Sequence, residues 1–115
     1  MNPKQLNAFV IKQLDDNKAL DIVTLNTKKI SDSTDAMIIA TGTSTRHVQS
    51  ISKKLIAAIK ESGVRPLGVE GEEYGEWVLI DLGDLVVHVM LQAQRELYNL
   101  EELWTATKRK RAEKR

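Results

Sequence analysis

Two stretches of the chain carry apolar residues at helical spacing. The first follows Asn2-Pro3-Lys4-Gln5, a typical helix start in which Asn2 is the N-cap and Gln5 completes a capping box. The second follows Ser44, a suitable N-cap, and ends near Gly63, a typical C-terminal stop. The apolar faces consist of Leu6, Phe9, Val10 and Leu14 in the first helix, and Val48, Ile51, Leu55, Ala58 and Ile59 in the second.

Five short runs have the composition of β-strands, and they cover residues 21–26, 36–41, 66–70, 77–82 and 85–91. The last two are joined at Gly83-Asp84, a tight-turn dipeptide. Asn99 and Glu102 form a second capping-box pattern, which predicts a helix carrying Leu100, Leu103 and Trp104. The order α-β-β-α-β-β-β-α predicts an α/β (α+β) fold with one mixed sheet of about five strands and about three packed helices.

The composition is that of one soluble globular domain. The chain has 115 residues, of which 42% are hydrophobic and 29% are charged. It has no cysteine, which excludes a disulfide scaffold, a thiolate metal site and cysteine catalysis. No apolar run is long enough to span a membrane, and the first residues lack the pattern of a signal peptide. We therefore expect a cytoplasmic protein without a membrane partner.

The net charge of +1 hides a segregation of charges along the chain. Residues 1–107, the expected domain, have 11 bases and 15 acids, whereas residues 108–115 have six bases and one acid. We expect this basic tail to be disordered, with a weak contact to RNA phosphates as the alternative. Within the domain, residues 66–94 contain six acids and no Lys or Arg. An acidic body of this kind argues against a general nucleic-acid binder, whose folded part should be basic.

Two features could belong to an enzyme. The segment T-G-T-S-T-R-H, residues 41–47, lies between a strand and a helix, where free N–H groups favour an anion. It lacks the Lys of a P-loop and the glycine spacing of a dinucleotide site, so a simple helix cap is the favoured interpretation and residual nucleotide binding stays open. Asp81 and Asp84 are separated by a turn, whereas nucleotidyltransferases bind metal through two Asp at i and i+2 on one strand. We therefore expect no catalytic residue, metal or cofactor; the alternative is a metal-dependent nucleotidyltransferase using Ser44, Asp81 and Asp84.

His88 and Trp77 are the remaining candidates. Strand alternation places His88 on one sheet face with Val86 and Met90, and a lone His cannot form a zinc site. It is either an ordinary sheet histidine or part of a binding face. Trp77 starts a strand directly after an acidic, glycine-rich loop, so it is either a contact anchor or a core residue.

Three strings taken together resemble one family. They are D-A-M-I-I-A-T-G-T-S-T-R-H-V from Asp35, G-V-E-G-E-E-Y-G-E-W-V-L-I-D-L-G-D-L-V-V-H-V-M from Gly68, and R-E-L-Y-N-L-E-E-L-W from Arg95. The resemblance is to the Iojap family, also called ribosomal silencing factors, and it covers residues 3–105. It implies a nucleotidyltransferase-like fold without transferase chemistry. It also implies binding to the large ribosomal subunit through ribosomal protein number fourteen, which blocks joining of the small subunit, and in organelles a role in large-subunit assembly.

The acidic stretch gives this implied function a physical basis. A basic ribosomal protein would be attracted by the acids, while a few apolar anchors would hold the complex. A homodimer through an exposed strand edge or apolar patch also stays open. The expected charged contacts are Glu70, Glu72, Glu73, Glu76 and Asp84. The expected packed centre consists of Trp77, Leu82, His88, Met90 and Tyr98.

Overall fold

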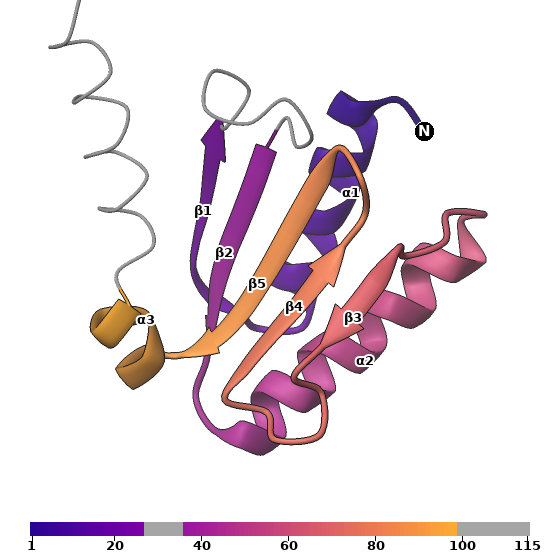
Figure 1. Ribbon diagram of the computed structural model, residues 1–115. Coiled ribbons are helices and arrows are strands. Elements are labelled where there is room, and N and C mark those ends of the chain that lie inside the picture. The colour runs from indigo at the N-terminus through magenta and orange to yellow at the C-terminus, as the bar shows by residue number, and fades with distance from the viewer. Residues whose placement is uncertain (27–35, 99–115) are drawn as a thin grey trace, which may run out of the picture.

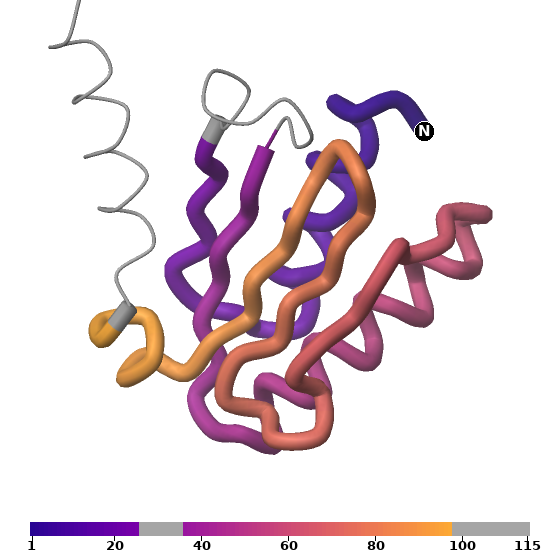
Figure 2. Tube along the Cα trace, viewed as in Figure 1, coloured from indigo at the N-terminus to yellow at the C-terminus, as the bar shows by residue number. Residues whose placement is uncertain are grey.

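The computed structural model describes residues 1–26 and 36–98 (Figure 1, Figure 2). The described elements, in order, are α1 (Pro3–Asp16), β1 (Leu20–Asn26), β2 (Ala36–Gly42), α2 (Thr45–Glu61), β3 (Gly68–Glu70), β4 (Trp77–Asp81), β5 (Leu85–Leu91) and α3 (Gln92–Tyr98). The first seven elements confirm the predicted order, and a helix follows β5, although α3 begins at Gln92 rather than near Asn99. The helix predicted to start at Asn99 and the basic tail lie outside the described residues.

The five strands form one mixed sheet in the order β1-β2-β5-β4-β3. The central strands β2 and β5 run parallel, and every other neighbouring pair is antiparallel. Figure 2 shows β2 and β5 side by side at the centre of the sheet. Both strands have nearly continuous apolar sequences, as expected for strands that are buried on two faces. The predicted mixed sheet is therefore confirmed.

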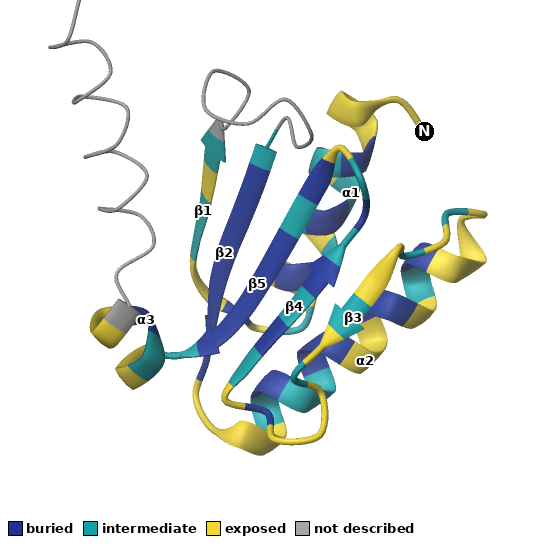
Figure 3. Cartoon of the chain, viewed as in Figure 1, coloured by how far each residue is buried: buried dark blue, intermediate teal, exposed yellow. Residues whose placement is uncertain are grey.

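Helices α1 and α2 cover one face of this sheet (Figure 1). Their predicted apolar stripes point inward: Val10 and Leu14 of α1 and Leu55 and Ile59 of α2 are fully buried (Figure 3). They pack in one cluster against the strands, on residues Ile38, Ala40, Val78, Ile80, Val87 and Val89. Burial of this aliphatic cluster is the main favourable contribution to folding. No helix in the described ranges is long and apolar enough to cross a membrane.

Local capping explains where the two long helices begin. The Asn2 side chain accepts a hydrogen bond from the Gln5 N–H at 2.8 Å, and the Gln5 side chain accepts one from the Asn2 N–H at 3.0 Å. The predicted capping box is therefore confirmed. Ser44 caps α2 by accepting the His47 N–H at 3.1 Å, and Gly63 follows the end of α2 with a φ of +93°.

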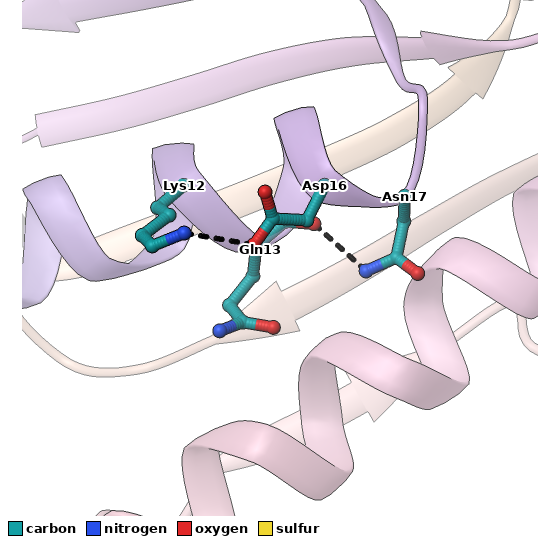
Figure 4. A network of polar contacts seen from close by, with 4 residues as sticks. All are labelled: Lys12, Gln13, Asp16 and Asn17. Carbon is teal, nitrogen blue, oxygen red and sulfur yellow. Dashed lines mark hydrogen bonds and ion pairs between the residues drawn. The ribbon is translucent and has the colours of Figure 1, made fainter.

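The end of α1 is tied to the start of α2. Figure 4 shows the polar contacts at this end of α1. Asn17 Nδ2 donates to the carbonyl of Gln13 at 2.8 Å and so satisfies one of the free carbonyls at the helix end. The carbonyl of Asn17 lies 3.1 Å from Nε2 of His47 on α2. Lys12 and Asp16 form an exposed ion pair at 3.1 Å, which contributes little to stability.

Candidate partner-binding surface

The sheet face opposite α1 and α2, called the second face below, has a different composition. Strand alternation and register place on it Leu25, Met37, Ile39, Thr41, Trp77, Leu79, Asp81, Val86, His88 and Met90. Met37, Ile39 and Met90 form a small buried cluster, and Leu25 and Trp77 pack against it. Among the described helices only the short α3 packs on this side, at the end of β2 and β5 (Figure 1). The second face is therefore apolar but carries polar side chains within it.

The acidic loop, residues 71–76, is folded against the start of α2. Gln49 Nε2 donates to the carbonyls of Glu72 and Glu73 at 3.1 and 3.0 Å. Gly75 has a φ of +70°, and a Cβ there would lie 2.6 Å from the carbonyl oxygen of Thr45. Gly71 has a φ of +87°, and a Cβ there would overlap the carbonyl of Trp77. The glycines and Gln49 therefore hold the backbone of this loop while leaving its side chains outward.

Four of the predicted acidic residues gather at this end of the sheet. Glu72, Glu73 and Glu76 are exposed on the acidic loop, and Glu70 is exposed on the adjoining edge strand β3. Glu70 pairs with Leu79 and so lies toward the second face. The remaining acid, Asp84, is exposed at the turn between β4 and β5. It lies at the opposite end of β5 from the acidic loop, about 23 Å away, because the Leu91 N–H bonds to the Glu76 carbonyl. The structure thus brings four of the five predicted charges together.

Trp77 and His88 form a direct pair on the second face. Nε1 of Trp77 donates to Nδ1 of His88 at 2.8 Å, and the two ring centroids are 5.8 Å apart. His88 is buried, with 5% of its surface exposed, and burial lowers its pKa from 6.5 to about 4 because it penalises the charged form. The indole N–H can only donate, so Nδ1 accepts and the proton of the neutral ring lies on Nε2. That Nε2 is buried and has no hydrogen-bond partner among the described residues.

The other predicted members of the packed centre are not all brought together. Met90 is fully buried on the second face, directly opposite Trp77 in the register between β4 and β5. Leu82 instead belongs to the core cluster under the long helices. It lies five residues after Trp77, and strand alternation therefore directs its side chain to the opposite face of the sheet. Tyr98 is the last residue of α3, and its side chain lies outside the described part.

A buried arginine fixes α3 to the sheet, and the sequence reasoning missed it. Arg95 is 8% exposed, and its Nη1 donates to the carbonyl of Asp21 at 2.6 Å and to Oγ1 of Thr41 at 2.8 Å. Asp21 lies where the β1–β2 register shifts and has a φ of +47°. The irregularity leaves a carbonyl for the guanidinium to bind, so α3 is held at the end of the second face nearest the acidic loop.

The features considered for an enzyme have structural partners instead. The Thr43 N–H, which could have met an anion, donates to Nδ1 of His47 at 2.9 Å. The Ser44 side chain is used as the cap of α2. The carboxylate of Asp81 accepts the Gly83 N–H at 2.9 Å and so stabilises its own turn. Within residues 1–26 and 36–98, no group of three or more His, Asp or Glu side chains could hold a metal ion.

Further surface residues escaped the sequence analysis. Tyr74 projects from the acidic loop with 71% of its surface exposed, which makes it an aromatic group among four carboxylates. Leu79 is half-buried on the second face, between Trp77 and Asp81. Gln49 holds the loop from 23 residues away. Strand alternation could have found Leu79, but the loop contact depends on the tertiary fold.

Comparison with known proteins adds independent information. The sequence profile of a family described as "Ribosomal silencing factor during starvation" matches residues 1–115. The match therefore includes the basic tail, which the three strings left out. A protein of Chromobacterium violaceum named ribosomal silencing factor RsfS is 44% identical over 108 residues, which cover 94% of this chain and 88% of that protein.

Structural similarity and a more distant relative agree with this match. A crystal structure of a Chromobacterium violaceum protein has a TM-score of 0.89 at 44% identity and covers 91% of this chain and 88% of that one. A mouse protein named mitochondrial assembly of ribosomal large subunit protein 1 is 33% identical over 100 residues, which cover 84% of this chain and 44% of that protein. None of these names describes an enzyme.

Proposed function

The chain belongs to the ribosomal silencing factor family, as its motifs predicted, and from this premise we propose that it represses translation by binding the large ribosomal subunit. In this proposal the bound protein occupies the surface that the small subunit needs, so the two subunits cannot join. The relatives' names support ribosome association, and the mouse relative's name refers to assembly of the large subunit. A contribution to large-subunit assembly is the accompanying proposal.

One observation carries the choice of surface: the four gathered carboxylates lie beside the half-buried Trp77. Residues 66–94 contain no Lys or Arg, so no base of this stretch neutralises them. A basic ribosomal protein, which we propose to be protein number fourteen, is a complementary partner for such a charge. Complementary charges speed encounter and fix orientation, while desolvated aromatic and aliphatic side chains slow dissociation.

The packed centre of the proposed interface consists of Trp77, His88 and Met90 with the neighbouring Leu79, and Tyr74 adds an aromatic contact on the loop. Leu82 contributes through the core that supports β4, and Asp84 contributes only a distant charge. Tyr98 remains a proposed contact at the end of α3. Binding at this surface needs no chemistry, because a body with axes of 43 × 33 × 21 Å obstructs a second particle sterically.

The proposed function excludes catalysis as its mechanism. The Thr43 N–H donates to His47, the Ser44 hydroxyl accepts the His47 N–H, and the Asp81 carboxylate accepts an N–H of its own turn. A nucleotidyltransferase would instead bind nucleotide with Mg²⁺, and calorimetry with both present is expected to give no heat of binding. We also propose that residues 108–115 add a salt-sensitive contact with ribosomal RNA, so their deletion weakens binding modestly.

The direct test is sedimentation of the purified full chain with isolated ribosomal subunits. We expect the protein to co-sediment with large subunits and to stay at the top of a gradient that contains only small subunits. The variant Glu72→Gln/Glu73→Gln tests the surface, because it removes two charges without changing the size of the loop. Equal co-sedimentation with both subunits, or with neither, would contradict the proposal.

A further inference from the structure

The hydrogen bond between Trp77 and His88 calls for a physical explanation, because burying a polar imidazole ring in the sheet costs desolvation free energy. His88 lies on a central strand between Val87 and Val89, where an aliphatic side chain would need no desolvation of polar atoms. The ring satisfies Nδ1 but leaves Nε2 buried without a partner among the described residues. A residue selected for stability alone would avoid this cost.

The register between β4 and β5 shows how His88 orients the Trp77 indole. Trp77 is paired with Met90, and His88 is paired with Leu79, so the indole must lean diagonally across the hairpin to reach Nδ1. The resulting contact joins rings whose planes are inclined by 47°. Because the indole Nε1–H donates along one direction only, its bond to Nδ1 of His88 fixes the rotamer of a large side chain that packing encloses only partly.

We propose that His88 is a positioning residue, which holds the Trp77 indole in its binding orientation before the partner arrives. This inference rests on the proposed function, because it concerns how the same surface reaches its affinity. A side chain already held in one rotamer loses less conformational entropy on binding than a freely rotating one. The depressed pKa of His88 supports the role, since a neutral ring keeps Nδ1 available as an acceptor down to acidic pH.

The test compares two nearly isosteric variants, His88→Leu and His88→Asn. Leu removes the acceptor, whereas the Asn amide oxygen can take a place near that of Nδ1. We expect His88→Leu to unfold at the same or a higher denaturant concentration than the wild type and yet to bind isolated large subunits about three- to tenfold more weakly. His88→Asn should recover part of this affinity, although it buries an amide.

Two further readouts separate positioning from a general structural effect. In a ¹⁵N-labelled protein the indole N–H resonance of Trp77, identified by its loss in Trp77→Phe, should shift in His88→Leu because its hydrogen bond is gone. In the Trp77→Phe background, which has no indole donor, His88→Leu should cause no further loss of affinity. The double variant also covers the case in which a single variant folds poorly.

The outcomes distinguish this inference from the proposed function. If the wild type binds and His88→Leu binds with the same affinity, the inference alone is overturned. Additive losses of affinity in the double variant would overturn it as well. An unshifted indole resonance in His88→Leu would show that the pair does not form. Wild-type protein that fails to bind large subunits at all would overturn the proposed function, and with it the inference.

Discussion

The two faces of the sheet are built from different kinds of residues. The face under α1 and α2 is a cluster of Leu, Ile, Val and Ala side chains, which stabilise the fold by being removed from water. The second face contains three of the four buried polar or charged side chains of the described part, namely Thr41, His88 and Arg95. Polar groups of this kind cost stability when they are buried. Because three of these four groups lie on the second face, we propose that this face serves recognition, whereas the face under the helices serves folding.

The largest expected effect comes from neighbouring residues on opposite faces of β4. Ile80 is fully buried under the helices, so Ile80→Ala should lower the free energy of unfolding by about 2–5 kcal/mol. Leu79 is half-buried on the second face, and Leu79→Ala should cost distinctly less stability but weaken binding. Urea denaturation and sedimentation with large subunits measure the two quantities. Equal losses of stability in both variants would show that the two faces of the sheet contribute equally to folding.

Trp77→Ala tests whether the second face carries binding energy. If Trp77 is a hot spot, its truncation should cost at least ~2 kcal/mol of binding, roughly thirtyfold in affinity. Some stability should also be lost, because Trp77 packs against the cluster of Met37, Ile39 and Met90. Affinity and unfolding should therefore be measured on the same preparation. A variant that loses folding instead of affinity would assign Trp77 to the core.

His88 should make the stability of the protein depend on pH. Its pKa is about 4 in the folded protein against 6.5 for an unperturbed side chain, so below pH 6.5 the unfolded chain binds a proton that the folded one does not. Stability should therefore fall as the pH decreases from about 6.5, by about 2 kcal/mol at pH 5 relative to pH 7.5. The loss should be complete below pH 4. In the same denaturation series, the His88→Leu variant should lack this decrease in the free energy of unfolding. If the free energies of unfolding of wild type and variant change with pH in parallel, His88 does not titrate in this way.

The acidic loop should affect the rate of encounter more than the lifetime of the complex. Replacing Glu72 and Glu73 by Gln should slow association severalfold at low salt, with the difference shrinking as salt increases. Asp84→Asn is the matched control, because it removes an exposed charge at the far end of the hairpin and should have a smaller effect. Stopped-flow association kinetics can measure both. A larger effect of Asp84 would move the proposed contact to the other end of the sheet.

The sequence was sufficient for features that depend on local geometry. The caps at Asn2 and Ser44 involve residues three positions apart, and the continuous apolar run of β5 reflects burial on both faces. Predicting β3 was less accurate, because the strand begins only at Gly68 rather than at Pro66, which has no N–H to donate. Such local rules predicted the order of the elements up to β5. The family was inferred from the resemblance of the three strings, and the comparisons confirm it.

The candidate surface was only partly predictable, because its key contacts join distant positions. Arg95 reaches Asp21 and Thr41 across 74 and 54 residues, and no local pattern indicates this. The bond between Trp77 and His88 requires the register of the hairpin as well as the diagonal lean of the indole. Leu82 could have been placed correctly, since strand alternation directs it to the face opposite Trp77.

Repression by steric blocking can be measured directly as the joining of purified large and small subunits at increasing concentrations of this protein. We expect the wild type to shift the mixture toward free subunits in a saturable way. We also expect Trp77→Ala to remain folded but to need a much higher concentration for the same shift. A joining equilibrium that is unchanged at saturating wild-type protein, with binding to the large subunit verified in the same gradient, would contradict repression by steric blocking.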